Sequence, residues 1–428
     1  MIVVFITILL FGLLTIGMPV AFTLAATGSL GLFLLGGFDT LAGVVSTAPL
    51  STAGTYELIS VPMFILMAEF VIVSGVADDL FKAAAAWVGR VPGGLAMATA
   101  IAGAGFGAIS GSSTAAAATL SSTTIPAMLK QGYEGKLAGG VVAISGTLAM
   151  LIPPSIALVL YGIIADVSIG QLLVGGVIPG ILVTLTIMAT VWVLVALDPS
   201  RAPRGRAFTM REKFASLKVV GPMVLLFIAV TGVIYSGIAT PTEASGIGAF
   251  GAFLLAIKEG KIDRKTLSKA LMNAIHASCM ILMIIVCAKI FGYFLTLTQV
   301  TQSLVNWVGH LDMSKWVIIA IILVGYIVLG CLMDQVAILI LTVPIVLPLI
   351  KTLGFDPVWF GVIIIVTAEI GLVTPPVGLN VFVVSRYTKM PLQEIFAGVW
   401  PHVYAHLMLL SVLVAFPEII LWLPSKMD

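Results

Sequence analysis

The sequence predicts an all-α polytopic membrane protein made of two inverted-topology repeats, each with about five transmembrane helices and one re-entrant hairpin. Three observations lead to this prediction. The 428 residues are 60% hydrophobic and only 9% charged, whereas soluble domains carry roughly 25% charged residues. Five pairs of prolines recur at one spacing, and most basic residues fall on one predicted side of the membrane.

Apolar stretches recur along the whole chain and approach the length of a transmembrane helix. Ile181 to Leu197 and Val219 to Tyr235 are two examples, and about 20 apolar residues cross the hydrocarbon core. Met1 to Gly17 lacks the basic region and the cleavage site of a signal peptide, so we expect this helix to be retained. The net charge of +2 gives no reason to expect a nucleic acid partner.

The two halves of the chain share a spacing of 222 residues. The pairs are Pro19 and Pro241, Pro126 and Pro348, Pro153 and Pro375, Pro154 and Pro376, and Pro179 and Pro401. Gly132 and Gly354 have the same spacing. Each proline in a membrane helix forces a break or turn that the fold must accommodate. Shared positions therefore indicate that the halves are related repeats.

The repeat divides the chain into two units joined by a basic loop. Each unit is expected to contain a hairpin whose arms are too short to cross the bilayer comfortably, followed by a helix interrupted at a Pro-Pro pair. The predicted ranges are 1–197 for the first repeat, with its hairpin at 93–128 and interrupted helix at 137–165, 198–218 for the loop, and 219–428 for the second repeat, with its hairpin at 316–350 and interrupted helix at 358–386.

The distribution of basic residues agrees with an inverted second half. An odd number of spans per half makes the second repeat enter from the opposite side. Asp198 to Lys218 is rich in Arg and Lys, which places this loop in the cytoplasm by the positive-inside rule. The resulting topology puts seventeen of the 21 basic residues on the cytoplasmic side and both termini on the outer side.

The two hairpin tips and the two interrupted helices are the strongest candidates for chemistry. Broken helices near the middle of a membrane present free carbonyls and helix ends to ions and substrates. Hard cations such as Na⁺ prefer oxygen ligands, although Ser, Thr and Gly at this density also favour close helix packing. The oxygen-bearing residues at the breaks are Ser110, Ser112, Ser113, Thr114, Ser145, Thr147, Ser155, Asp334, Thr367 and Thr374.

Five charged residues interrupt the apolar segments, and a charge at membrane depth is a functional hypothesis by default. Asp334 lies at the second hairpin tip and is the best candidate. Glu369, on the interrupted helix, could serve an ion site or proton handling. Glu243 follows a Pro turn and is expected to cap a helix, while a structural contact is an equal alternative for Glu69 and Lys289.

The histidines and cysteines give no sign of a metal centre or cofactor. His402 and His406 share a helix face, and we expect them at the lipid interface. Cys279, Cys287 and Cys331 lie in apolar segments without metal-ligand spacing, which favours packing. We therefore expect no cofactor, with Na⁺ as the only metal ion.

Two functions of other classes are weaker interpretations. The stretch Gly107 to Gly111, with Ser110, superficially resembles the nucleophile loop of a serine hydrolase. No convincing base accompanies that serine, so we do not expect an enzyme. A passive channel with a Gly/Ser/Thr-rich filter is the other alternative, whereas a two-half repeat favours alternating access around one site.

The runs GAISGSSTAAAATLSSTTIPAMLKQGY, ISGTLAMLIPPSIALVLYG and TAEIGLVTPPVGLNVFVVS resemble the large membrane subunit of tripartite ATP-independent periplasmic (TRAP) transporters. The similarity extends over essentially the whole chain. The resemblance implies an elevator-type carrier in the bacterial inner membrane, with both termini periplasmic. It further implies a small four-helix membrane subunit, a periplasmic binding protein that delivers an organic anion, and a Na⁺ gradient as the driving force.

The resemblance also implies two sodium sites, one where each hairpin tip meets its interrupted helix, and an anion site between the tips. By motif, the first sodium site involves Ser110, Ser112, Ser145, Gly146 and Pro153, and the second Gly330, Asp334, Thr367, Ala368 and Thr374. For the substrate we expect Ser113, Thr114, Thr147, Pro154, Glu369 and Pro376. Dicarboxylates, sialic acid and other sugar acids all remain open as substrates, and a stand-alone carboxylate carrier of the same superfamily is the alternative assembly.

Overall fold

The computed structural model describes residues 1–206, 208–310 and 313–427. Within these ranges every regular element is a helix. Seven helical segments are long and apolar enough to cross a membrane by length and composition. The prediction of an all-helical, multi-pass membrane protein is thereby confirmed.

The first half begins with helices at the edge of the molecule and ends with a long helix after the interrupted one. Its elements are α1 (Ile2–Thr15), α2 (Val20–Ala53), η1 (Tyr56–Ile59), α3 (Ser60–Ser74), α4 (Val76–Val88), α5 (Gly94–Ser110), α6 (Ser113–Thr123), α7 (Ile125–Lys130), α8 (Gly135–Thr147), η2 (Leu148–Met150), α9 (Ile156–Ala165), α10 (Ile169–Gly175) and α11 (Val177–Leu197). The helices α5 and α6 form the first hairpin, and α8 and α9 are the two parts of the first interrupted helix.

The second half follows after the short element η3 (Pro199–Arg201). Its elements are α12 (Met210–Tyr235), α13 (Pro241–Lys258), α14 (Arg264–Leu297), α15 (Val300–Gly309), α16 (Lys315–Gly330), α17 (Gln335–Thr352), α18 (Pro357–Gly371), α19 (Leu379–Thr388), α20 (Leu392–Ala415), α21 (Glu418–Leu421) and η4 (Pro424–Lys426). The second hairpin is α16 and α17, and the second interrupted helix is α18 and α19.

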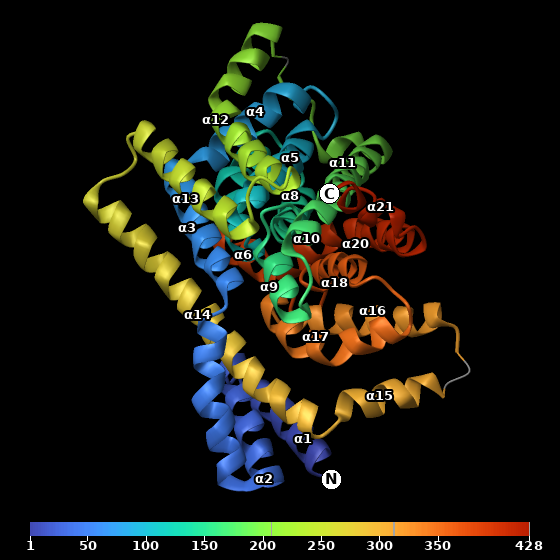
Figure 1. The fold of residues 1–428 in the computed structure, drawn as a ribbon. Coiled ribbons are helices and arrows are strands. Elements are labelled where there is room, and N and C mark those ends of the chain that lie inside the picture. The colour runs from blue at the N-terminus through green and yellow to red at the C-terminus, as the bar shows by residue number, and fades with distance from the viewer. Residues whose placement is uncertain (207, 311–312, 428) are drawn as a thin grey trace.

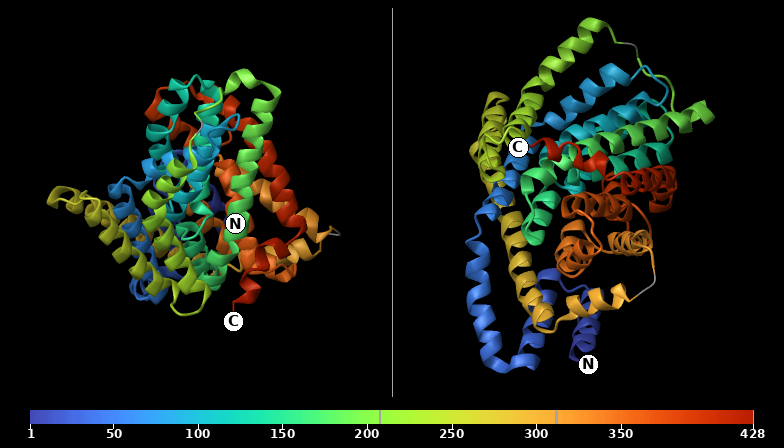
Figure 2. Two further views of the ribbon diagram at one scale, coloured as in Figure 1. Left: turned by 90° about the horizontal axis from the view of Figure 1, so that it is seen from above. Right: turned by 45° about the vertical axis from the view of Figure 1, so that its right-hand side comes forward.

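The helices α2, α3, α13 and α14 form a band along one side of the molecule (Figure 1). Within α2, Gly37 has a non-helical φ of 71° and divides the helix in two. Gly28 lies so close to α14 that a Cβ there would be 2.8 Å from the Cα of Phe291. Figure 2 shows α2 and α14 side by side at the edge of the fold. Close backbone approach through small residues is how helices pack without a hydrophobic driving force between them.

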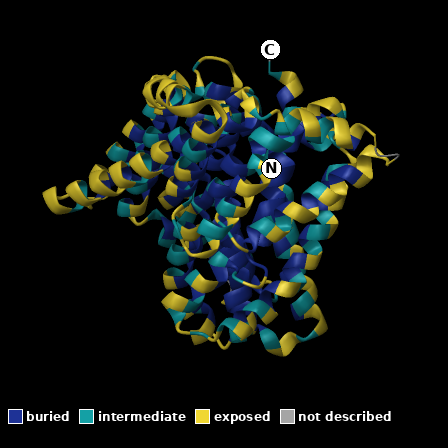
Figure 3. Cartoon of the chain, turned by 90° about the horizontal axis from the view of Figure 1, so that it is seen from below, coloured by how far each residue is buried: buried dark blue, intermediate teal, exposed yellow. Residues whose placement is uncertain are grey.

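Buried residues gather in the interior of the molecule (Figure 3), and α5, α8, α9 and α18 consist mostly of buried residues. The second arm of each hairpin reaches across to the other half. In the first hairpin α6 contacts both α8 and α19, and in the second hairpin α17 contacts both α18 and α9. The hydroxyl of Tyr161 on α9 donates to the carbonyl of Pro357 at 2.7 Å. Each hairpin therefore touches both interrupted helices, and the halves are joined inside the core.

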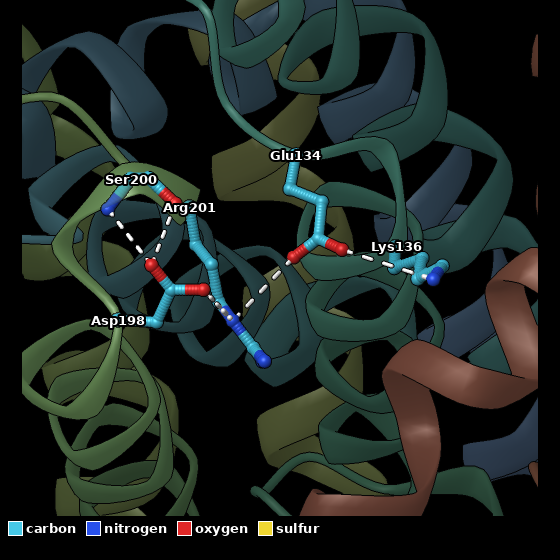
Figure 4. A network of polar contacts seen from close by, with 5 residues as sticks. All are labelled: Glu134, Lys136, Asp198, Ser200 and Arg201. Carbon is cyan, nitrogen blue, oxygen red and sulfur yellow. Dashed lines mark hydrogen bonds and ion pairs between the residues drawn. The ribbon is translucent and has the colours of Figure 1, made fainter.

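The loop between the halves is fastened to the start of α8, the first part of the first interrupted helix (Figure 4). The backbone N–H of Glu134 donates to the carbonyl of Arg201 at 2.8 Å. The Arg201 Nε lies 3.2 Å from Asp198 Oδ2 and 3.7 Å from Glu134 Oε2. Hydrogen bonds from Ser200, and then from Arg201, lower the pKa of the Asp198 carboxyl. Since such exposed ion pairs contribute little free energy, the network fixes where the loop lies more than how stable the fold is.

The contact between α8 and α20 generates a stability prediction. A Cβ on Gly140 would collide with the backbone of Gly398, and overpacking of this kind costs about 1–3 kcal/mol. We expect Gly140→Ala to lower the thermal unfolding temperature of the purified protein. Gly43→Ala is the control, because a Cβ at Gly43 meets no atom within 4 Å. Equal unfolding temperatures for the two variants would contradict the close approach.

Candidate functional site

The first hairpin tip places three serines at the end of α5 and the start of α6. Ser110 is the last residue of α5 and is 3% exposed. The Ser112 hydroxyl caps α6 by accepting from the Ala115 N–H at 3.4 Å. Ser113 is buried and Thr114 is exposed. The tip therefore has a buried and an exposed side, both lined with hydroxyl oxygens.

The first interrupted helix runs alongside this hairpin. Pro153 and Pro154 are buried, and Gly111 at the tip lies against Ile156 on the far side of the break. Ser145 lies against Gly103 on α5. Gly103 precedes Ser110 by seven residues, which corresponds to about 10 Å along a helix. The side chains of Ser110 and Ser145 are therefore not neighbours in this conformation.

The remaining member of the first predicted set, Gly146, packs against α6. A Cβ on Gly146 would be 2.9 Å from the Ala117 Cβ, so the absence of a side chain brings α8 and α6 together. Ser155 behind the break caps α9 by accepting from the Leu158 N–H at 3.2 Å, and it also donates to the Met150 carbonyl. This capping satisfies backbone groups that the interruption would otherwise leave free.

The second hairpin tip meets the second break through glycines. A Cβ on Gly330 would lie 2.8 Å from the Ala368 carbonyl oxygen and 2.8 Å from the Gly371 Cα. Next to them, the Cys331 Sγ and the Thr374 hydroxyl are 2.9 Å apart. Gly330, Ala368 and Thr374 are thus brought together, as the predicted second set requires. Cys331, expected to be a packing residue, is part of this contact.

Two members of the second set lie apart from that contact. Asp334 is exposed and caps α17, with Oδ1 accepting from the Ala337 N–H at 3.0 Å. The Thr367 hydroxyl is fully buried and donates to the Ile363 carbonyl at 2.7 Å. Asp334 corresponds to Ser112 at the spacing of 222, and both residues cap the second arm of their hairpin.

The residues expected to bind substrate divide into a buried and an exposed group. Thr147 and Glu369 are fully buried, and Pro154 is buried as well. Thr114 and Pro376 are exposed. The second Pro-Pro break is therefore open on one side, whereas the first is enclosed.

Several buried side-chain oxygens have no hydrogen-bond partner within the described residues, and most of them lie in the hairpins and interrupted helices. They are Ser110 Oγ, Ser145 Oγ, Gln335 Oε1, Glu369 Oε1 and Oε2, Asn380 Oδ1 and, outside this region, Thr231 Oγ1. Buried polar atoms are ordinarily paired, and an unpaired one costs about 1–3 kcal/mol. Oxygen is also the ligand atom that a hard cation prefers.

Gln335 and Asn380 belong to this group, and the sequence analysis missed both. The Gln335 side-chain N–H donates to the Ile365 carbonyl at 3.3 Å, and that of Asn380 donates to the Ala143 carbonyl at 3.3 Å. A signal existed, since both are amides in apolar surroundings next to a predicted break. The sequence prediction rests on charged and hydroxyl side chains, and these two residues are neutral amides.

The expectations for the other polar residues have mixed outcomes. The lipid-interface position predicted for His402 and His406 is wrong, since both are 0% exposed where α20 packs against α8, α11 and α18. Glu243 caps α13 in a reciprocal capping box with Thr240, as expected. Glu69 accepts a hydrogen bond from Asn273 at 3.0 Å, a structural contact between α3 and α14.

Two cavities lie away from the predicted site. One of about 520 Å³ is lined by Lys289 and Tyr293 on α14 and Asp166 after α9. The other, of about 480 Å³, shares Asp166 and reaches Thr240 before α13. No predicted sodium or substrate residue lines either one. The candidate site is therefore a set of buried oxygens and open tips and does not coincide with these cavities.

Comparison with known proteins identifies the family. A family model described as "Tripartite ATP-independent periplasmic transporter, DctM component" matches residues 7–419. The C4-dicarboxylate TRAP transporter large permease protein DctM of Pseudomonas aeruginosa is 36% identical over 375 residues, 87% of each chain. The chain belongs to this family. It is a TRAP transporter large membrane subunit.

Other relatives differ in the substrate that their names give. The sialic acid TRAP transporter large permease protein SiaM of Vibrio cholerae is 29% identical over 97% of this chain and 96% of its own length. The solved structure of the Alcanivorax borkumensis YdaH transporter superposes with a TM-score of 0.66 at 15% identity, covering 94% of this chain and 98% of that one. That likeness shows the fold alone.

Membership of the family supports transport of organic acids and a multi-pass membrane location. It also implies a small membrane subunit and a periplasmic binding protein as partners. The relatives are named as permeases, which agrees with the expectation that the chain is not an enzyme.

The tight contact at the second tip can be tested with a matched pair of glycines on α16. We expect Gly330→Ala to reduce substrate uptake by the reconstituted transporter at least tenfold, because the added methyl would push the tip off Ala368 and Gly371. Gly325→Ala should transport normally, since its Cβ meets no atom within 4 Å. Normal uptake by Gly330→Ala would show that the contact is not needed for transport.

Proposed function

We propose that the protein is the permease subunit of a sodium-coupled TRAP transporter that imports an organic anion by an elevator mechanism. A periplasmic binding protein delivers the anion, a carboxylate or a sugar acid, and the small membrane subunit completes the assembly. Na⁺ binds where each hairpin tip meets its interrupted helix, orders the tips and completes the anion site between them. The core then slides across the bilayer.

The unpaired buried oxygens carry the sodium part of this proposal. Ser110 Oγ and Ser145 Oγ belong to the first hairpin and its interrupted helix, and no described donor satisfies them. Gln335 Oε1 and Glu369 Oε1 supply oxygens at the second junction. A monovalent cation would satisfy such acceptors without a proton donor, and its binding would lower the cost of keeping them buried.

An inverted repeat with five spans and one hairpin in each half is supported by features that recur at the spacing of 222. Ser112 and Asp334 each cap the second arm of their hairpin. Gly132 and Gly354, which precede the two interrupted helices, both have positive φ, at 82° and 77°. Equivalent backbone geometry at equivalent positions is what a repeated unit would produce.

Movement of the core is supported by the nature of its seam with the outer helices. Within the described ranges, no side-chain hydrogen bond or ion pair joins α1–α3 or α12–α14 to the hairpins and interrupted helices. Inside the core, by contrast, polar side chains tie separate elements together, as the Tyr161 to Pro357 bond does. Such a core can move as one body along a seam that no polar side-chain bond crosses.

The anion is proposed from chemistry and from the names of relatives, which include a C4-dicarboxylate and a sialic acid permease. Hydroxyls at the first tip, such as Ser113 and Thr114, and the N-terminal ends of the broken helices are suited to bind carboxylate oxygens. The bacterial inner membrane, with both termini periplasmic, is the location that this cycle requires.

The sodium sites predict a specific loss in proteoliposomes that contain the small subunit and receive loaded binding protein. We expect Ser110→Ala and Ser145→Ala each to raise the half-saturating Na⁺ concentration for uptake at least fivefold. Ser121→Ala is the matched control, because Ser121 is equally buried on the first hairpin but donates to the Ala117 carbonyl at 2.6 Å. Unchanged Na⁺ dependence in both test variants would refute the assignment.

The same liposomes separate the proposal from its two alternatives. Uptake should require both an inward Na⁺ gradient and the binding protein. Uptake that needs Na⁺ but ignores the binding protein would indicate a stand-alone carrier. Flux that needs neither would indicate a passive channel.

A further inference from the structure

Asn380 connects the two interrupted helices directly. Its backbone N–H donates to the Leu372 carbonyl at 3.2 Å, which spans the break between α18 and α19. Its side-chain N–H donates to the Ala143 carbonyl on α8 at 3.3 Å. The side chain is 0% exposed. One residue therefore holds the second break and the first interrupted helix at the same time.

Both attachment points lie beside the proposed cation sites. Leu372 is two residues before Thr374, which contacts the second tip. Ala143 is two residues before Ser145, whose hydroxyl has no partner. A shift of either segment on cation binding is therefore transmitted through Asn380 to the segment beside the other site.

Gln335 makes a bond of the same kind without bridging the halves. Its side-chain N–H donates to the Ile365 carbonyl at 3.3 Å, and Ile365 is 222 residues after Ala143. Both carbonyls thus receive an amide donor at equivalent points of the two interrupted helices. Gln335, however, joins α17 to α18 within the second half, whereas Asn380 joins α19 to α8.

Packing alone does not require an amide at position 380. The corresponding residue of the first half, 222 positions earlier, is Leu158, which is also 0% exposed in the first turn of the helix after the break. An apolar side chain therefore fits this environment. The Asn380 Oδ1 has no partner among the described residues, so the amide carries a desolvation cost that leucine would avoid.

We infer that Asn380 is a positioning residue that couples cation binding at the first hairpin junction to cation binding at the second. The inference rests on the proposed sodium sites and adds the connection between them. Coupling of this kind is reciprocal, because each site must change the affinity of the other by the same factor.

Hydrogen exchange of the full transporter in nanodiscs measures both sites separately. Segment 371–380 is the reporter of the second site and segment 143–152 of the first, and Na⁺ is titrated against K⁺. With native Asn380, Ser145→Ala should raise the half-saturating Na⁺ concentration for protection of segment 371–380 about fivefold or more, the lower end of typical allosteric coupling. In the Asn380→Leu background, Ser145→Ala should shift this half-saturating Na⁺ concentration less than about twofold.

Trp359→Phe is the matched control, because it removes a buried side-chain hydrogen bond, from Trp359 Nε1 to the Leu413 carbonyl, that joins α18 to α20 within the second half and does not bridge the halves. In that background the effect of Ser145→Ala on segment 371–380 should persist. Reciprocity adds a measurement that leaves Asn380 intact and therefore remains possible if the leucine variant does not fold: Thr374→Ala should also raise the half-saturating Na⁺ concentration for protection of segment 143–152.

Three results would overturn the inference. They are a cross-site shift that persists in Asn380→Leu, a cross-site shift that is absent with native Asn380, and a cross-site shift that is lost in Trp359→Phe as fully as in Asn380→Leu. Absence of Na⁺-dependent protection at both segments of the unaltered protein is a different result, since it would refute the proposed sodium coupling itself and the inference with it.

Discussion

The constraint on which this fold depends is that backbone polar groups in a bilayer need partners within the protein. In the core, regular helix geometry is broken at the two hairpin tips and the two Pro-Pro breaks. Each is enclosed by other helices or capped locally, as Ser155 caps α9 and Asp334 caps α17. Irregular backbone at membrane depth is tolerated where protein encloses it. The contact of each hairpin with both interrupted helices provides this enclosure.

The two halves solve that backbone problem alike and differ in side-chain chemistry. Ser112 and Asp334 are both caps, but one is neutral and the other acidic. Where the first interrupted helix has Thr147, whose hydroxyl donates to the Ile144 carbonyl, the second has Glu369 with both oxygens unpaired. The first Pro-Pro pair is buried and the second exposed. Two similar scaffolds therefore present unequal sets of side chains, which suits the proposed cycle in which cations and an anion bind together.

The sequence predicted the architecture better than the contacts of individual side chains. Proline spacing and hydropathy locate hairpins and breaks because backbone geometry in a membrane depends on local composition. The role of Asn380 and the burial of His402 could not be predicted in this way, since both depend on which distant helix packs alongside. The division of α2 at Gly37 was also missed, because apolar composition continues through that turn. Local chemistry fixes the breaks, and tertiary packing decides which oxygens remain unpaired.

The arrangement of polar contacts bears on how the molecule could move. The core is tied internally by hydrogen bonds between separate elements, including Trp359 Nε1 to the Leu413 carbonyl at 3.3 Å and the bonds of Tyr161 and Asn380. Buried polar bonds have strict geometry and resist shear, whereas apolar contacts can be exchanged for similar ones. Where the core meets the outer band, α3 against α9 and α14 against α17, no polar side-chain bond within the described ranges opposes displacement. A rigid core along a seam without polar side-chain bonds meets the mechanical condition for the elevator movement that we propose, and in that movement cation binding at either proposed junction would act on the whole core.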